Sequence, residues 1–186
     1  MLDQSATDAE LVLDELRGAG MQVAAKRVDS GADLESSLHE FGPDVVLTEH
    51  SLPDIDFRVA LGVIQNVRPH TPLIVVTGGW LKADDTGSCV RAGAETVISK
   101  KNLVRLAPAI AAALDARSAL EKLTPRQIEV MRLVAGGFRT RDIAQRLELS
   151  VKTVESHRQE VMRRLGLRNM ADLVRYAVRV GLVGEN

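Results

Sequence analysis

The first 120 or so residues alternate between strand-like and helix-like segments, and this alternation limits the fold more than any other feature of the sequence. Strand signals occur at residues 21–28, 44–49, 71–79 and 95–100. Helix signals occur at residues 8–20, 33–42, 56–67, 82–93 and 102–120. Strand–helix units of about 20–25 residues predict a parallel sheet with helices on both faces.

Three polar side chains stand at the carboxyl ends of these predicted strands. Glu49 ends the run "DVVLTE", Thr77 lies near the end of "TPLIVVTGG", and Lys100 ends "ETVISK". In an open parallel sheet the functional crevice lies outside the carboxyl ends of the strands. We therefore expect these three side chains to share one crevice.

Residues 123–186 carry no strand signal and predict an all-α arrangement. The predicted helices there cover residues 123–137, 140–150, 150–166 and 169–182. Each has a residue suited to an N-cap, namely Thr124, Thr140, Ser150 and Asn169. Four short helices, of which the second and third are separated by a tight turn, form a helix-turn-helix pattern.

The net charge of −1 hides a division between the two halves. Residues 1–122 hold 12 lysines and arginines against 18 acidic residues, whereas residues 123–186 hold 12 against 7. A basic second half is a candidate for binding a polyanion.

Other features exclude several classes of protein. The single cysteine, Cys89, rules out an intramolecular disulfide and a multi-cysteine metal site, and it suits a reducing cytoplasm. No apolar run approaches the roughly 20 residues that cross a membrane, and the acidic, polar start does not resemble a signal peptide. No nucleophile, base and oxyanion donor converge, so we expect neither an enzyme nor a bound metal or cofactor.

The second half closely resembles the LuxR-type DNA-binding domain of bacterial response regulators. The stretches "LTPRQIEV", "AGG", "DIAQRLELSVKTVESHR" and "RLGL" carry the resemblance across residues 123–183, with Gln127 where that family usually has Glu. The first half resembles the CheY-like receiver domain in "FGPDVVLTEHSLPD", "PLIVVTGG" and "RAGAETVISK". The order of domains is that of the NarL/FixJ family, which places a receiver at residues 1–117, a linker at 118–122 and the DNA-binding domain at 123–186.

The receiver half departs from the family pattern at its phosphorylation site. Asp3 and Gln4 stand at the acidic pair that holds Mg²⁺, and Glu49 replaces the acceptor Asp, while Thr77 and Lys100 are kept. Mg²⁺ demands near-ideal octahedral geometry, and Glu is one methylene longer than Asp. We expect a receiver that is not phosphorylated, in which Glu49 either imitates a phosphate by pairing with Lys100 or only forms a salt bridge.

The first strand of the CheY-like doubly wound sheet is truncated or missing, because the chain starts where that strand should finish. Unpaired edges within the sheet would follow. The start could lie upstream, another element of the chain could fill the gap, or a partner subunit could supply the strand. The sequence leaves these three alternatives open.

In the second half, the resemblance makes the helix at about 151–164 the recognition helix. Val154, Val161 and Leu165 should pack inward. Glu155, Ser156 and Gln159 are the candidates for reading base edges in the major groove. The candidates for phosphate contacts are Lys152, Thr153, Arg158, Arg163 and Arg164. His157 either contacts a phosphate or packs against the preceding helix.

A single such domain covers little DNA, so we expect a homodimer on double-stranded DNA. The candidate dimer contacts on the last helix are Leu173, Val174, Ala177 and Val178. The chain is thus expected to be a sequence-specific transcription regulator of the two-component type, controlled by dimerisation, a regulatory protein or a small ligand. Two alternatives stay open: a conventional kinase-activated regulator that uses Asp54 or Asp56, and a protein-interaction module without selective DNA binding.

Overall fold

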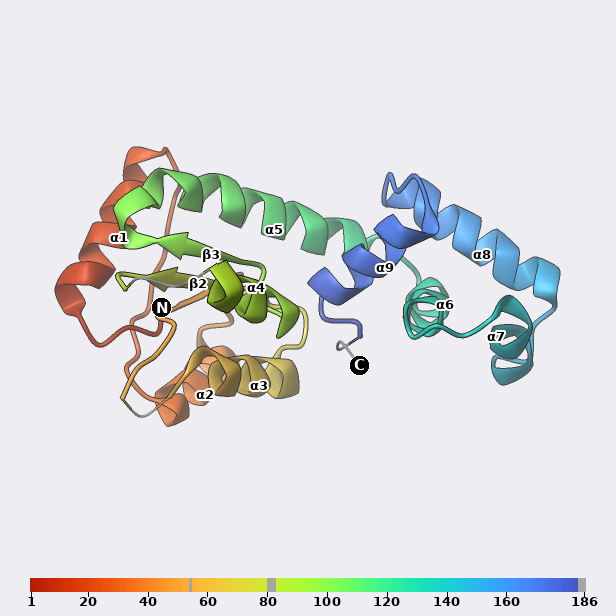
Figure 1. Ribbon diagram of the computed structural model, residues 1–186, viewed down its shortest axis with the longest axis horizontal. Helices are drawn as coiled ribbons and strands as arrows, with labels where there is room; N and C mark the ends of the chain where they lie inside the picture. The colour runs from red at the N-terminus through yellow and green to blue at the C-terminus, as the bar shows by residue number, and fades with distance from the viewer. Residues whose placement is uncertain (54, 80–82, 184–186) are drawn as a thin grey trace. The chain divides into compact units, whose positions relative to one another are not determined.

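The computed structural model describes residues 1–53, 55–79 and 83–183 and divides into two compact units, Met1–Leu114 and Asp115–Asn186 (Figure 1). Each unit is described by itself. Helix α5 (Leu106–Glu121) extends into the predicted linker at 118–122, and the domain boundaries at residues 117 and 123 stay a prediction. Within the described residues, no helix is both long and apolar enough to span a membrane.

The first unit is built on a parallel sheet, as the strand–helix alternation predicted. Its strands β1 (Val46–Thr48), β2 (Leu73–Thr77) and β3 (Thr96–Ser99) lie in the order β1-β2-β3. Leu47 pairs with Ile74 in the first ladder, and Val75 pairs with Val97 in the second. Because all three strands run in one direction, their carboxyl ends meet at a single edge.

Helices follow the strands where the helix signals predicted them. They are α1 (Ala6–Gly18), α2 (Gly31–Glu40), α3 (Phe57–Val67) and α4 (Ala83–Arg91), followed by the 3-10 helix η1 (Lys100–Arg105) and α5. Asn102 has non-helical backbone angles inside η1, which Ser99 caps through its side chain. The side chains of Ser5, Ser30 and Asp56 cap α1, α2 and α3 in the same way.

The strand residues alternate between two apolar layers, which is the pattern of a sheet covered on both faces. Val46, Leu73 and Val75 point into one layer with residues from α2 and α3. Leu47, Ile74 and Val76 point into the other layer with residues from α1 and α5. Figure 1 shows α2 and α3 on one side of the sheet and α1 and α5 on the other.

The predicted strand at 21–28 is wrong, because only Val28 forms a β-bridge. Its partner is Leu2, which also bridges Thr48 and so stands between two neighbouring segments. The N–H of Leu2 donates to Leu47 O at 2.8 Å, and the N–H of Glu49 donates to Leu2 O at 3.1 Å. Segment 21–27 forms no β-bridge within the described chain, although Lys26 O accepts a hydrogen bond from the Met1 nitrogen at 2.6 Å.

The second unit contains the four helices that the sequence predicted. They are α6 (Pro125–Ala135), α7 (Thr140–Arg146), α8 (Val151–Arg164) and α9 (Met170–Arg179). Their apolar faces meet in one core, in which Val130, Met131, Ile143 and Leu173 are fully buried.

Three of the four predicted N-caps are confirmed in this unit. Thr124 and Gln127 form a reciprocal capping box, and Ser150 and Asn169 cap α8 and α9. The predicted cap at Thr140 is wrong, because Arg139 holds that position and makes no side-chain cap bond. In this box the N–H of Thr124 donates to Gln127 Oε1 at 2.9 Å.

Candidate functional site

A single ammonium group holds three carboxylates at the carboxyl edge of the sheet. Lys100 Nζ lies 3.0 Å from Asp3 Oδ2, 2.7 Å from Asp8 Oδ2 and 2.8 Å from Glu49 Oε2. The side chain of Lys100 is only 10% exposed and that of Asp3 only 7%. The structure therefore brings Glu49 and Lys100 together, as their places at strand ends predicted.

Backbone elements fix each member of this cluster. Glu49 follows β1, and its Oε1 accepts a hydrogen bond from the N–H of His50 at 3.3 Å. Asp3 follows the bridge at Leu2, and its Oδ1 accepts from the N–H of Ser5 at 2.8 Å. Both oxygens of each of these two carboxylates are thus engaged.

Lys100 comes directly after β3, and its stem passes the end of β2. The stem passes beside Gly78, where an added Cβ would lie 3.5 Å from Lys100 Cδ. The lysine thereby crosses from the third strand of the sheet toward the first.

Burial and ion pairing act in opposite directions on Lys100. Burial alone would lower the pKa of its ammonium group, but hydrogen bonds to Asp8, Glu49 and Asp3 outweigh burial and raise this pKa. The hydrogen bond from Lys100 likewise lowers the pKa of Asp8. Lys100 is therefore held as a cation, which keeps the cluster paired at neutral pH.

Asp8 is a member of the cluster that the sequence pattern did not single out. It lies in the first turn of α1, three residues after the cap Ser5. A helix that begins at the carboxyl edge of a parallel sheet carries its first-turn acids into the crevice. That position was the available signal, but the family resemblance pointed to the adjacent pair Asp3 and Gln4 instead.

Gln4 and Thr77 do not join the cluster as the sequence suggested. Gln4 is exposed and makes no described contact with Lys100. Thr77 is buried, and its Oγ1 accepts a hydrogen bond from the N–H of Gly79 at 3.2 Å, as an ordinary turn hydroxyl would.

This arrangement does not fit a Mg²⁺ ion. Such an ion needs oxygen ligands at about 2.0–2.1 Å in octahedral geometry. Here the carboxylates of Asp3, Asp8 and Glu49 instead converge on the ammonium of Lys100, and the neutral oxygen of Gln4 lies outside the cluster.

Asp56, one of the two alternative phosphate acceptors, already caps a helix. Asp54 lies outside the described residues. Asp56 Oδ1 accepts from the N–H groups of Arg58 and Val59, at 2.9 and 3.0 Å, as the N-cap of α3. Asp56 thus has a structural partner on the helix that it begins.

In the second unit, α8 presents a polar face and buries an apolar one. Val154 and Val161 are fully buried, and Leu165 is half-buried against the same core. The side chains expected to reach bases or phosphates on the opposite face, Lys152, Glu155, Ser156 and Gln159, are all exposed. Thr153 is half-buried, and its hydroxyl lies 2.8 Å from Ser150 Oγ.

The three predicted arginines of α8 are each held by another group. Arg158 donates to Thr140 Oγ1 at 2.6 Å, which ties α8 to α7. Arg163 and Arg164 both pair with Glu160, and their hydrogen bonds lower the pKa of Glu160 to about 2.

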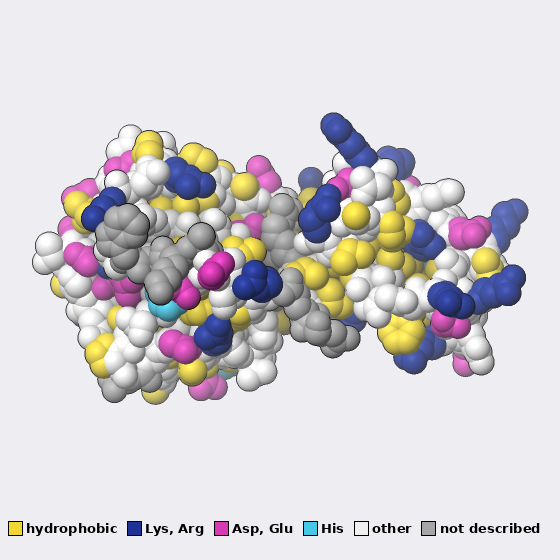
Figure 2. All heavy atoms as spheres, in the orientation of Figure 1, with side chains coloured by type: hydrophobic (Ala, Val, Ile, Leu, Met, Phe, Trp, Pro, Cys, Tyr) yellow, Lys and Arg dark blue, Asp and Glu magenta, His cyan; other side chains and the backbone are white. Residues whose placement is uncertain are grey.

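Basic side chains are numerous on this unit. In Figure 2, lysine and arginine side chains gather on the end of the unit where α7 and α8 lie. His157 is half-buried.

The candidate dimer contacts on α9 fall into two pairs. Leu173 and Ala177 are fully buried in the core of the unit, so they pack within the monomer. Val174 and Val178 are half-buried. These two valines are therefore the better placed of the four for contact with another chain.

Comparison with known proteins agrees with both units. Residues 2–111 match the response regulator receiver domain, and residues 121–177 match the bacterial regulatory proteins of the luxR family. The fimbriae Z protein of Salmonella typhimurium is 27% identical over 182 residues, which cover 87% of this chain and 86% of that protein. The oxygen regulatory protein NreC of Staphylococcus aureus is also 27% identical, over 88% of each chain.

Solved structures show the same fold. RcsB from Salmonella enterica serovar Typhimurium, bound to the promoter rprA with phosphomimetic BeF₃⁻, is 24% identical with a TM-score of 0.51, and the match covers 94% of this chain and 96% of that one. Two RcsB dimers bound to two parallel DNAs give a TM-score of 0.54 at 24% identity, over 94% and 95% of the chains. The chain therefore belongs to the response regulators, as a NarL/FixJ-type member that joins a receiver domain to a luxR-family helix-turn-helix domain.

Proposed function

We propose that this chain binds specific double-stranded DNA sequences as a homodimer in the cytoplasm and that phosphorylation does not switch its receiver. One observation carries the second part: the ammonium of Lys100 is already held by Asp3, Asp8 and Glu49 at 2.7–3.0 Å. Control would then come from dimerisation, a regulatory protein or a small ligand.

The arrangement of α8 supports DNA reading. Glu155, Ser156 and Gln159 share the exposed face and offer acceptors and donors to base edges in the major groove. Lys152 lies on the same face in the first turn, where it can reach a phosphate. The RcsB structures named above contain DNA, which agrees with this role for a related fold.

The arginines of α8 have a more specific part in this proposal. Arg158 fixes α8 against α7 through Thr140 and so orients the reading helix. Arg163 and Arg164 share the carboxylate of Glu160, and they would have to loosen this pairing to contact phosphates. We therefore assign Lys152 and Thr153 to the first phosphate contacts, and Arg163 and Arg164 to contacts formed after rearrangement.

The crevice opposes phosphate transfer for two reasons. The carboxylate of Glu49 is already paired with Lys100, so attack on a phosphodonor would first have to break this ion pair. The neighbouring acids Asp3 and Asp8 surround the same ammonium and hold no arrangement that suits Mg²⁺. Glu49 in this state resembles a fixed ion pair more than an acceptor.

The DNA-binding proposal is tested by selecting duplexes from a random pool and measuring affinity for the selected site at several salt concentrations. Gln159→Ala should weaken discrimination at one base position by about 1–3 kcal/mol. Lys152→Ala should reduce the slope of log affinity against log salt concentration by about one, without changing the base preference. Lys101→Ala, on the first unit, is the control and should change neither quantity.

An absence of any selected sequence would overturn DNA reading. It would favour the second candidate, a protein-interaction module that keeps a basic surface but does not select DNA. Binding that is equal for all duplexes and disappears at moderate salt would have the same meaning.

The receiver proposal is tested with radiolabelled acetyl phosphate and Mg²⁺ on the full chain. We expect no label at residue 49, and Glu49→Asp shows whether one methylene is the obstacle. Label on the unaltered chain that disappears in Asp56→Asn would instead support a conventional phosphorylated regulator. Label that maps to Asp54 or Glu49 would equally overturn the proposal.

The dimer proposal is tested on α9. Val174→Asp should shift the chain from dimer to monomer in analytical ultracentrifugation and weaken DNA binding, while the thermal unfolding of the second unit changes little. Leu173→Asp is the contrasting variant, because this buried side chain belongs to the core and its replacement should unfold the unit. A dimer that persists in Val174→Asp places the contact elsewhere.

A further inference from the structure

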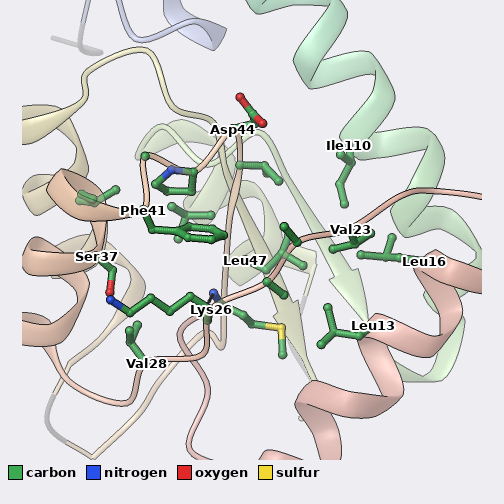
Figure 3. Close-up of a pocket in the computed structure, with 18 of the residues that line it drawn as sticks. Leu13, Leu16, Val23, Lys26, Val28, Ser37, Phe41, Asp44, Leu47 and Ile110 are labelled. Carbon is green, nitrogen blue, oxygen red and sulfur yellow. Dashed lines mark hydrogen bonds between the residues drawn. The ribbon is translucent and has the colours of Figure 1, made fainter.

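Two connecting segments of this chain are held in different ways. In the first unit, segment 21–28 lies beside a cavity of about 440 Å³ that Val23, Leu47 and Ile110 help to line (Figure 3). In the second unit, the connection between α7 and α8 covers only residues 147–150, and hydrogen bonds to α7 and α6 hold its backbone. These bonds fix the direction in which α8 leaves α7.

The turn closes α7 with a Schellman motif. The N–H of Glu148 donates to Gln145 O at 3.4 Å. The N–H of Leu149 donates to Ala144 O at 2.9 Å. Glu148 has a φ of 53°, which lies in the left-handed region where glycine is the usual residue. A longer side chain at this φ costs free energy, so the turn keeps its shape because other contacts hold it.

Arg126 of α6 makes one of these contacts. Its Nη2 donates to Leu147 O, the carbonyl at the end of α7, and its Nη1 donates to Glu129 Oε2 at 2.7 Å. The carbonyl end of a helix carries partial negative charge, so a guanidinium is a favourable donor there. Arg126 is half-buried, and the capping box at Thr124 fixes the turn of α6 from which it extends. Arg126 therefore ties the turn between α7 and α8 to a third helix.

The contacts of two arginines hold different parts of the helix-turn-helix. Arg158 donates to Thr140 and so holds α8 against α7. Arg126 donates to the turn and so holds this pair of helices against α6. Together the two contacts fix the direction of α8 relative to the rest of the unit.

A small rotation at the turn would displace the residues that are proposed to read bases. Ser156 and Gln159 follow the cap Ser150 by about 9 and 14 Å along the helix axis, at about 1.5 Å per residue. A rotation of α8 by about 10° at its first residue would therefore move these side chains by about 2 Å. Hydrogen bonds form over a range of only about 2.7–3.2 Å, so a displacement of this size would break a contact with a base edge.

We propose that Arg126 is a positioning residue for DNA reading, which sets the direction of α8 through its bond to Leu147 O and does not touch DNA itself. This inference rests on the proposed DNA binding, and it adds a residue outside the reading helix to those that determine specificity. The ion pair with Glu129 holds the other side of the guanidinium, so Arg126 is already engaged within the protein on both of its terminal nitrogens.

The test measures the affinity of full-length variants for the selected duplex and for a scrambled duplex by fluorescence anisotropy. Arg126→Ala should bind the selected duplex about tenfold more weakly, the loss of roughly one base contact, and the scrambled duplex within about twofold. The slope of log affinity against log salt concentration should not change, because no phosphate contact is lost. Arg126→Lys keeps a donor for Leu147 O and should stay within about threefold of the unaltered chain. Arg132→Ala removes the same charge from an exposed position of α6 and, as the control, should change neither affinity.

Variants of Glu148 separate positioning from stability. Glu148→Gly relieves the left-handed backbone and should raise the urea midpoint of the second unit. Glu148→Gln removes the same charge but keeps a side chain, so it should not raise this midpoint. In the double variant that combines Arg126→Ala with Glu148→Gly, the urea midpoint should return toward that of the unaltered chain. The selected duplex should still bind about tenfold more weakly, because the turn has lost its tie to α6.

Four results would overturn the inference, and each is distinct. Recovery of specific affinity in the double variant would make Arg126 a stabilising residue only. An equal loss on both duplexes, with a slope lower by about one, would mean that Arg126 contacts a phosphate directly. An Arg126→Ala variant that binds the selected duplex as tightly as the unaltered chain would overturn this inference and leave DNA reading intact. An unaltered chain that selects no duplex would overturn DNA reading and this inference together.

Discussion

The polar and charged side chains in the crevice of the first unit and those on the exposed face of α8 (Lys152, Glu155, Ser156 and Gln159) lie in opposite environments. In the crevice, one buried lysine holds three acids, and both oxygens of Asp3 and Glu49 have partners. On α8, Lys152, Glu155 and Gln159 point into solvent, while Val154 and Val161 hold the helix in place. Polar groups that already form ion pairs and hydrogen bonds within the protein are less able to react, whereas exposed polar groups remain available to a partner.

This difference also predicts how each unit is stabilised. The second unit depends on a continuous apolar core, which contributes in proportion to the apolar area buried. The first unit has two apolar layers as well, but its crevice adds a buried cation whose loss would leave carboxylates facing one another. Removing the charge of Lys100 should therefore destabilise the first unit, and removing apolar volume from the core of the second unit should destabilise that unit.

The largest effect is expected in the apolar core of the second unit. Met131 is fully buried, and Met131→Ala should lower the free energy of unfolding by about 4 kcal/mol, because it removes buried methylenes and leaves a cavity. The half-buried Met162 is the control, and Met162→Ala should lose less than half as much. Urea denaturation followed by circular dichroism measures both. Equal losses would mean that this core is not the main source of stability.

The next effect tests the buried charge. Lys100→Met keeps the length of the side chain but leaves Asp3, Asp8 and Glu49 without their cation. The first unit should lose about 3 kcal/mol, near the lower end for breaking a buried pair, since Asp8 is partly exposed. Lys101→Met is the matched control on an exposed neighbour, with a change within about 0.5 kcal/mol. A stabilised Lys100→Met variant would show that burial of the ammonium outweighs its ion pairs.

The pattern of apolar runs in the sequence is sufficient to predict the parallel sheet and the meeting of Glu49 with Lys100. It is sufficient because the carboxyl ends of parallel strands lie at one edge of the sheet, regardless of the conformation of the loops between them. Asp8 was missed because its position depends on where α1 begins, and that is set by the cap at Ser5. The strand at 21–28 failed because a strand needs a neighbour to pair with, which its own sequence does not reveal.

The secondary structure of the second unit was easier to predict, because the hydrogen bonds and caps of a helix join residues that are close in the sequence. The caps Thr124, Ser150 and Asn169 each form the bond expected of them. Thr140 failed as a cap because its hydroxyl accepts from Arg158 on α8, a contact made in the folded unit and absent from local sequence. The same long-range effect separates the buried Leu173 and Ala177 from Val174 and Val178 on α9.

A smaller effect concerns the ammonium of Met1 in the first unit. Its pKa is lowered from about 8 to about 6, chiefly by burial, so the unfolded chain binds this proton more readily between these values. Stability should therefore rise by roughly 1–2 kcal/mol as the pH increases from 6 to 8. A chain acetylated at Met1 should lack this contribution. All other ionisable groups are the same in the two chains, so the difference between the two urea-denaturation curves isolates the ammonium. Parallel pH profiles would mean that the ammonium is solvated.

The smallest effect distinguishes folding from reading on α8 itself. Ser150 caps the helix through its side chain, so Ser150→Ala should lower the free energy of unfolding by about 1 kcal/mol. Ser156 is exposed in the middle of the same helix, and Ser156→Ala should leave stability unchanged or slightly raised, because Ala has the higher helix propensity. The order should reverse for base preference in the selected DNA site, because the proposal places Ser156, and not Ser150, against the base edges. If Ser156→Ala leaves both stability and base preference unaltered, the reading face of α8 must be narrowed to Glu155 and Gln159.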